Sequence, residues 1–209
     1  MFRQRMESLS TPVEVIIVVS KNLKDQIGQG GSYEKIVVAE RDGRGYAFTQ
    51  GIKFATGKIL VFLHADTILP VDWDHKIINA FRDRNVVGGG FSLKFDTPHY
   101  YLKLLVFMSD LLFDLTGEMW GDRALFIRSE LIKEDHSILE VPLMEDVRLS
   151  HFMKKKGKVV KLKGAVITSS DTFVKRGLVR HTFKIIRCRL WYALGGNLDK
   201  IYRCYYSIK

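Results

Sequence analysis

The stretch that decides the fold reads Lys58-Ile-Leu-Val-Phe-Leu-His64 and continues into Ala65, Asp66 and Thr67. Its apolar residues are continuous rather than alternating, which is typical of a strand buried on both faces of a sheet. In open α/β sheets, ligands bind at the carboxyl ends of the strands. The stretch therefore predicts a covered sheet with His64 and Asp66 at its ligand-binding edge.

Strand-like and helix-like segments alternate on both sides of this stretch. We expect strands over residues 13–20, 35–39, 58–64 and 86–95, and helices over residues 45–56, 72–84, 99–116, 144–156 and 177–194. Two of these helices stop at glycines, Gly117 and Gly157, the residue type that most often ends a helix. This alternation predicts an α/β fold whose mostly parallel sheet is flanked by helices.

Composition limits the class of protein. The chain has 209 residues, of which 46% are hydrophobic, enough to fill one sizeable core. Its two cysteines cannot build a disulfide framework or a cysteine-rich zinc site, so we expect a reducing, cytoplasmic location. No stretch approaches the ~20 apolar residues of a membrane-spanning helix, and the first residues lack the apolar core of a secretory signal.

The basic charge is concentrated near the C-terminus. The net charge is +10, and residues 172–209 hold nine Lys or Arg residues against Asp199 alone. Such a segment indicates an anionic partner, namely phospholipid, nucleotide phosphate or nucleic acid. Residues 177–194 resemble a basic amphipathic helix that lies on anionic lipid, although packing on the sheet fits them equally. Because no nucleic-acid recognition motif is present, we expect no nucleic-acid partner.

Three short motifs carry polar side chains suited to chemistry. His64 and Asp66 leave the strand on the same side and can share a divalent cation, although Asp66 can equally cap the following turn. Glu145 and Asp146 open a helix, where either the helix dipole or a role as general base explains them. The sequence Trp120-Gly-Asp-Arg123 places an aromatic ring beside a carboxylate, as in many sugar sites and also in ordinary turns.

Taken together, these motifs carry a resemblance to a known family. They occur in the order Gly43-Arg-Gly-Tyr-Ala47, Gln50-Gly51, Ala55-Thr-Gly57, Phe62-Leu-His-Ala-Asp-Thr67, Gly121-Asp122 and Val141-Pro-Leu-Met-Glu-Asp-Val147. In this order and spacing, residues 13–170 resemble the family-two glycosyltransferases of the GT-A fold. The FLHADT and PLMEDV stretches are similar to a bacterial subgroup associated with arsenosugar biosynthesis. We expect residues 1–170 to form the glycosyltransferase domain and residues 171–209 a basic helical extension of it.

The resemblance implies an inverting transfer of a sugar from a nucleotide-diphosphate donor to a hydroxyl of a small molecule or lipid. Asp66 would hold Mn²⁺ or Mg²⁺ on the diphosphate, with His64 in place of the first acid of the family's DxD motif. Asp146 would be the base, with Glu145 beside it. The resemblance also implies Arg44 near the nucleotide and Gly121 and Asp122 at the acceptor-side turn, where Trp120 adds an aromatic ring. We count Gln50 with the donor-binding residues. Lys175 and Arg176 follow the family's last matching strand and can either approach the diphosphate or be solvated.

The sequence departs from the family at its start. The family begins with a strand that ends in a Pro-x-x-Asn-Glu-Glu-like turn, whereas residues 13–20 here match the family's second strand. Loss of a strand from inside a sheet leaves its neighbours with unpaired backbone groups. A wrong start codon, a truncated gene, or rearranged strand pairing, within the chain or with a second chain in a homo-oligomer, would each explain the departure. The Gln-x-x-Arg-Trp motif of processive members is also absent, which argues against polymer synthesis.

Two functions therefore remain open. One is a metal-dependent inverting glycosyltransferase, cytoplasmic or peripheral on the inner face of the membrane. The other is a glycosyltransferase relic that acts as a binding or scaffold protein at an anionic membrane surface.

Overall fold

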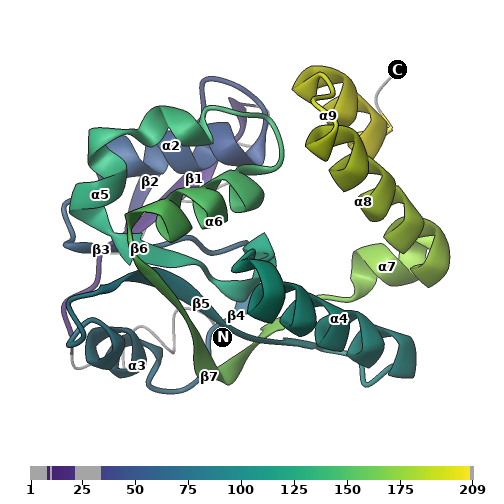
Figure 1. The fold of residues 1–209 in the computed structure, drawn as a ribbon. Coiled ribbons are helices and arrows are strands. Elements are labelled where there is room, and N and C mark those ends of the chain that lie inside the picture. Colours follow the sequence, from purple (N-terminus) through teal and green to yellow (C-terminus); the bar gives the residue numbers. More distant parts are fainter. Residues whose placement is uncertain (1–8, 10, 22–33, 208–209) are drawn as a thin grey trace.

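Two sheets of different size organise the fold in the computed structural model, which describes residue 9 and residues 11–21 and 34–207 (Figure 1). Strands β1 (Val15–Val19) and β2 (Glu34–Val38) pair in parallel as a two-stranded sheet. The other five strands form a second sheet, in the order β3 (Ile59–Val61), β6 (Phe126–Arg128), β5 (Val86–Phe95), β7 (Lys158–Thr168) and β4 (Thr67–Ile68).

The α/β class is confirmed, but the larger sheet is mixed rather than mostly parallel. Only β5 and β7 pair in parallel, whereas β3 with β6, β5 with β6, and β4 with β7 are antiparallel. The sequence pattern detects long apolar strands, and β4 and β6 have only two and three residues. These two short strands are the ones that reverse the chain direction, so the pattern missed the antiparallel pairing.

Helices cover both faces of the sheet. They are α2 (Arg44–Phe54), α3 (Trp73–Ala80), α4 (Tyr100–Thr116), α5 (Ser129–Glu134), α6 (Glu145–Lys156), α7 (Asp171–Arg176), α8 (Leu178–Ala193) and α9 (Leu198–Tyr206), with 3-10 turns η2 (Gly121–Arg123) and η3 (His136–Leu139). Gly117 and Gly157 end α4 and α6 as expected. No helix in these described ranges is long and apolar enough to cross a membrane.

The side chains of β3 and of the residue that follows it divide the core into two clusters. Leu60 and Phe62 pack with Ile52 of α2 and Leu149 of α6, on one face. On the other face, a cluster built around Trp73, Ile77, Phe91 and Phe126 brings α3 against the sheet. The arrangement of α2 and α6 above the sheet and α3 below it is visible in Figure 1.

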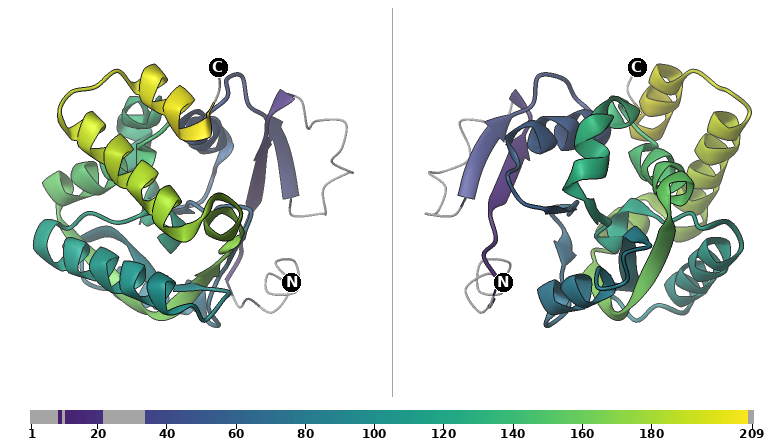
Figure 2. Two further views of the ribbon diagram at one scale, coloured as in Figure 1. Left: turned by 90° about the vertical axis from the view of Figure 1, so that its right-hand side faces the viewer. Right: turned by 60° about the vertical axis from the view of Figure 1, so that its left-hand side comes forward.

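The C-terminal helices are attached through a third, smaller cluster. Cys188 of α8 and Ile201 of α9 pack on Leu143, Met144 and Val147, at the start of α6. Figure 2 shows α8 and α9 stacked on one side of the molecule, while β1 and β2 stand away from the larger sheet on the other. The residues before Glu145 are thus buried beneath a helical cover.

Candidate active site

A cavity of about 500 Å³ lies between the end of β3, the turn η2, the start of α6 and the helices α7–α9. It gathers most of the side chains that the sequence singled out. Those that line it are Arg44, His64, Asp66, Trp120, Gly121, Asp122, Asp146 and Arg176. Their convergence from segments far apart in the sequence makes this cavity the candidate active site.

Asp146 is held in a fixed orientation at the cavity wall. Its Oδ2 accepts a hydrogen bond from the backbone N–H of Gly121 at 3.0 Å, and its Oδ1 accepts one from Val147 N–H at 2.9 Å. The carboxylate is buried yet still lines the cavity. Each carboxylate oxygen has a further acceptor position, so Asp146 can accept a proton from a bound hydroxyl.

Gly121 is required by a close approach of two side chains. A Cβ at this position would lie 2.9 Å from His64 Nε2 and 3.4 Å from Asp146 Cβ. The absence of a side chain therefore lets the end of β3 and the start of α6 meet across the turn η2. This contact brings the expected metal ligand and the expected base into one cavity.

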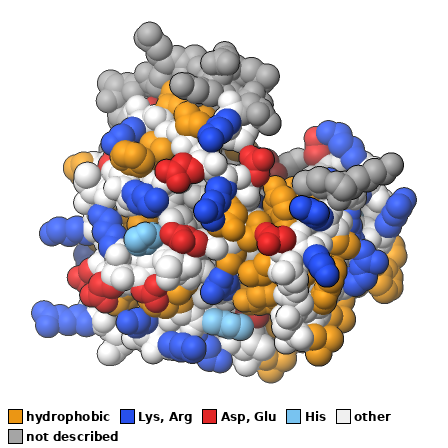
Figure 3. All heavy atoms as spheres, turned by 90° about the horizontal axis from the view of Figure 1, so that it is seen from above, with side chains coloured by type: hydrophobic (Ala, Val, Ile, Leu, Met, Phe, Trp, Pro, Cys, Tyr) orange, Lys and Arg blue, Asp and Glu red, His pale blue; other side chains and the backbone are white. Residues whose placement is uncertain are grey.

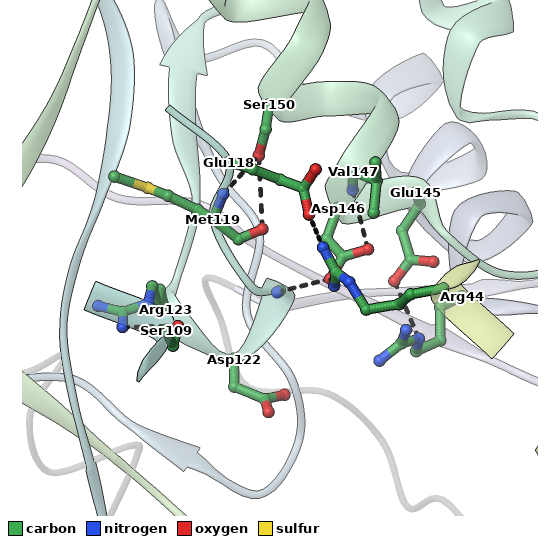
Figure 4. Close-up of polar contacts among 12 residues, drawn as sticks. Arg44, Ser109, Glu118, Met119, Asp122, Arg123, Glu145, Asp146, Val147 and Ser150 are labelled. Carbon is green, nitrogen blue, oxygen red and sulfur yellow. Dashed lines mark hydrogen bonds and ion pairs between the residues drawn. The ribbon is translucent and has the colours of Figure 1, made fainter. Parts of the chain in front are cut away.

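Glu145 and Arg44 form a buried ion pair beside Asp146 (Figure 4). Arg44 Nε lies 2.9 Å from Glu145 Oε1, and the Glu145 side chain is almost wholly buried. Burial raises the pKa of Glu145 to about 7, and the charge of Arg44 opposes that rise. Burial alone would lower the pKa of Arg44, but Glu145 and Asp146 outweigh it and raise the pKa. Glu145 therefore positions Arg44, whereas Asp146 faces the cavity.

The residue before this acidic pair has a strained backbone. Met144 adopts a left-handed conformation, with φ 69° and ψ 21°, at the N-cap of α6. Such a conformation costs a non-glycine residue roughly 1–2 kcal/mol and persists where surrounding packing enforces it. The contacts of Met144 with Cys188 and Ile201 supply that packing, so α8 and α9 help to set the direction in which α6 begins.

Sequence reasoning missed Arg189 of α8. Its guanidinium contacts Glu118, and its Nη1 lies 4.0 Å from Asp146 Oδ2. Burial, and after it the nearby charge of Arg44, lowers the pKa of Arg189 to about 10. The amphipathic pattern of residues 177–194 was the only available signal, and it does not show which basic residue turns inward.

Two residues that were expected to bind the sugar donor lie outside the cavity lining. Gln50 is buried within α2. Lys175 is exposed, and its Nζ donates a hydrogen bond to Asp171 Oδ2 at 2.9 Å. Its neighbour Arg176 does line the cavity, so of the two adjacent cations only Arg176 faces the site.

His64 and Asp66 fit a metal ion shared with a substrate, but not a complete protein cage. Both line the cavity, and no group of three His, Cys, Asp or Glu residues suited to a metal occurs in the described part of the chain. His64 Nε2 is buried without a hydrogen-bond partner among these residues and lies 3.8 Å from Asp122 Oδ1. Burial lowers the pKa of His64, which keeps the ring neutral and able to ligate. Mg²⁺ commonly takes one or two protein ligands together with phosphate oxygens and water.

Comparison with known proteins identifies the class. A sequence profile described as glycosyl transferase family 2 matches residues 11–133, more than half of the 209-residue chain. The chain therefore belongs to glycosyl transferase family 2, and its α/β fold is GT-A-like. A search of curated protein sequences finds no match to it.

Two solved structures share the fold at low sequence identity. One is TarS residues 1–349 from S. aureus, with a TM-score of 0.51 and 18% identity, covering 98% of this chain and 65% of that one. The other is 4-diphosphocytidyl-2C-methyl-D-erythritol synthase from Anaerococcus prevotii, with a TM-score of 0.50 and 14% identity, covering 78% and 74%. This chain thus spans slightly less than two thirds of the TarS fragment, and these likenesses establish the fold alone.

Proposed function

We propose that this chain transfers a sugar from a nucleotide-diphosphate donor to a hydroxyl acceptor, with inversion at the anomeric carbon. The observation that carries the proposal is the fixed Asp146 carboxylate, which shares one cavity with His64 and Asp66. Family membership supports the transferase class and a nucleotide-sugar donor.

The proposed reaction is a single displacement. The acceptor hydroxyl gives its proton to Asp146 as its oxygen bonds to the anomeric carbon, and the bond from that carbon to the diphosphate breaks. One displacement inverts the configuration, so no protein nucleophile takes part. Asp66 and His64 would hold Mg²⁺ or Mn²⁺, which would neutralise charge on the departing diphosphate.

Further side chains have proposed roles in binding. Arg44 and Arg176 add positive charge to the cavity wall, where a diphosphate would be stabilised electrostatically. Glu145 positions Arg44 through their ion pair. We assign Gln50 and Lys175 only supporting roles near the donor, because neither lines the cavity. Trp120, Gly121 and Asp122 would contact the acceptor from the turn η2.

An exposed apolar surface supports a lipid acceptor at an anionic membrane. Helices α4 and α8 expose large hydrophobic side chains, namely Tyr100, Leu104, Phe107, Met108, Leu111 and Leu115 on α4, and Val179, Phe183, Ile186, Leu190 and Trp191 on α8. In Figure 3, hydrophobic side chains lie together with Lys and Arg on the right-hand side. Apolar area combined with basic charge is the usual basis of peripheral membrane binding. The protein would then work on the inner, cytoplasmic face of the membrane.

Other features of the sequence favour different acceptors or assemblies. The FLHADT and PLMEDV stretches at residues 62–67 and 142–147 support membership of the subgroup associated with arsenosugar biosynthesis, and hence a small-molecule acceptor.

Residues 171–209 would belong to the same domain as residues 1–170, because α8 and α9 line the cavity. A homo-oligomer is compatible with this arrangement.

A thermal-shift titration tests the donor site. Uridine and guanosine diphosphates would be added with and without Mn²⁺, since a ligand that binds only the folded state raises Tm. We expect a metal-dependent rise that disappears in Asp66→Ala and persists in Asp171→Ala, the same change on the exposed start of α7. If no nucleotide raises the Tm of a cooperatively folded sample, the chain is a glycosyltransferase relic that acts as a binding protein rather than an enzyme. Vesicle flotation with anionic and with neutral lipid then tests whether it binds an anionic membrane.

A further inference from the structure

The two cysteines of the chain lie against each other beneath the helical cover of the active site. Cys188 belongs to α8 and Cys204 to α9, and both are free thiols. They pack in the same small cluster, which seats α8 and α9 on the start of α6. Cys188 also forms a hydrogen bond with Cys204. The two sulfurs are therefore in contact, although 16 positions separate them in the sequence.

The two thiols differ in their access to solvent. Cys188 is 1% exposed, whereas Cys204 is only partly buried. Burial, and after it the charge and hydrogen bond of Cys204, raises the pKa of Cys188 to about 11. Cys188 is thus a neutral thiol shielded from dissolved reagents. A reagent that approaches the pair meets Cys204 first.

A cation is directed at the more accessible sulfur. Arg187 Nη2 donates a hydrogen bond to Cys204 Sγ at 2.9 Å. Positive charge beside a sulfur stabilises the thiolate, which is the form of cysteine that attacks oxidants. Arg189, two residues further along α8, instead contacts Glu118 in the active site. The two arginines therefore serve different partners, and Arg187 belongs to the thiol pair.

Helix α9 is attached by the apolar cluster around Ile201 and by hydrogen bonds at its surface. Arg176 donates a hydrogen bond to Tyr205 O at 3.4 Å. Lys184 donates one to Ser207 Oγ at 2.7 Å. Both hydrogen bonds are exposed to solvent, and elements held in this way open locally at low free energy. A covalent bond between α8 and α9 would therefore restrain the cover more firmly than its present contacts do.

We propose that Cys188 and Cys204 are a redox-sensitive pair that closes an intrachain disulfide and locks α8 to α9 over the active site. Arg189 beside Cys188 and Tyr205 beside Cys204 both line the active-site cavity, so the bridge would fix two of its walls. Disulfides in a reducing compartment are typically transient and redox-sensing rather than structural. The proposal rests on the thiol pair, independently of the transferase chemistry.

The oxidant is hydrogen peroxide, and the reaction has two steps. In the first, the Cys204 thiolate attacks a peroxide oxygen and becomes a sulfenic acid. The O–O bond breaks, and the leaving hydroxide takes the proton lost from Cys204. In the second, the Cys188 sulfur attacks the Cys204 sulfur, the S–O bond breaks, and a second water leaves with the Cys188 proton. The two sulfurs thus give up two electrons, and the peroxide is reduced to two waters.

The test oxidises the folded full chain and locates the bridge. Hydrogen peroxide is added in small molar excess, and tryptic peptides are compared by mass spectrometry with and without dithiothreitol. We expect a chain in which the Cys188 and Cys204 peptides are joined, at a mass lower by two hydrogen atoms, and separated again by dithiothreitol. Amide hydrogen exchange in α8 and α9 should slow about tenfold in the oxidised chain, with α3 as the internal control.

Variants separate the roles of the residues in the pair. Cys188→Ala should leave Cys204 as a sulfenic acid that dimedone labels, whereas Cys204→Ser should leave the buried Cys188 thiol unreacted. Arg187→Met should slow bridge formation severalfold, and the matched change Arg180→Met on the exposed surface of α8 should not. Equal rates in these two arginine variants would remove Arg187 from the proposed role.

Three results with the unmodified sequence would overturn the proposal. They are oxidation of Cys204 to the sulfinic acid while Cys188 stays free, a bridge that joins two chains, and a bridge that forms only after unfolding in urea. A bridge that leaves exchange in α9 unchanged would equally overturn the proposed lock on the cover.

Discussion

The two sides of the molecule are stabilised in different ways. On the side of η2 and α6, backbone groups are held by buried side chains: Met119 N–H donates to Ser150 Oγ at 3.0 Å, and Gly121 N–H donates to Asp146 at 3.0 Å. On the opposite side, β1 and β2 form a separate pair, attached to the start of β3 by Glu14, which accepts hydrogen bonds from Thr56 and Gly57. The proposed base thus lies on the side where buried side chains hold the backbone in place.

Arg123 shows how far this support extends. Its side chain is fully buried, and it donates hydrogen bonds to Phe91 O at 3.2 Å and to Ser109 Oγ at 2.9 Å. It also pairs with Asp110 at 2.9 Å. One cation therefore connects η2 with β5 and α4. The difference between the two sides shows that buried side chains fix the backbone around η2 and α6, whereas β1 is held at the start of β3 by hydrogen bonds to the exposed Glu14.

The largest expected effect comes from removing the base. Asp146→Asn should lower sugar transfer by about 10²–10⁴-fold, the usual contribution of a general base. Asparagine can still accept the hydrogen bond from Gly121 N–H and loses only the one from the adjacent Val147 N–H, so the fold should persist. Release of nucleoside diphosphate is the measurement, and Asp171→Asn is the control. An unchanged rate in Asp146→Asn would remove Asp146 from the proposed role.

Removal of the buried cation should be the next largest effect. Arg123→Met should lower the free energy of unfolding by about 1–3 kcal/mol, because the buried acceptors Phe91 O and Ser109 Oγ lose their donor. Asp110 is partly exposed and keeps Lys161 as a partner at 3.3 Å. Urea unfolding followed by circular dichroism measures it. The exposed Arg84 offers a matched control, since Arg84→Met should change stability by less than about 0.5 kcal/mol. Equal losses of stability in the two variants would show that the buried contacts of Arg123 do not stabilise η2.

Glu145 should make stability depend on pH. Its pKa is raised from 4.5 to about 7 by burial, so between these values the folded state binds more protons than the unfolded state. Stability should therefore fall as pH rises through this window. Urea midpoints at several pH values would show the slope, and Glu145→Gln should flatten it. A slope unaffected by the substitution would place its origin elsewhere.

The smallest effect concerns the attachment of β1. Burial would raise the pKa of Glu14, but hydrogen bonds from Thr56 and Gly57 outweigh it and lower the pKa. The stability that these hydrogen bonds give to β1 should therefore be lost as pH falls through that lowered pKa. Glu14→Ala should speed amide exchange in β1 about fivefold, which corresponds to roughly 1 kcal/mol. Exchange in α6 serves as the internal control. If β1 and α6 accelerated equally, the two sides would not be independently stabilised.

Local signals in the sequence predicted the long elements and much of the site. The apolar run before His64 marks β3, and glycines mark the ends of α4 and α6. The acidic start of α6 marked Glu145 and Asp146 as candidates, and the resemblance to family-two glycosyltransferases alone distinguished Asp146 as the base. The features that the sequence did not predict depend on tertiary contacts. Arg189 approaches Asp146 from a helix 43 positions later in the sequence, and the two- and three-residue strands β4 and β6 carry no period that could reveal them.

The cover formed by α8 and α9 has a consequence for the timing of synthesis. Leu143 and Met144 line the same cavity as Tyr205 and Tyr206, yet residue 206 follows residue 143 by 63 positions. At roughly 5–20 residues per second, the ribosome adds that stretch in about 3–13 s. Through this interval the growing chain holds its acidic pair without the helices that later bury the preceding turn. The cavity that holds Asp146 is therefore complete only after α8 and α9 have been made.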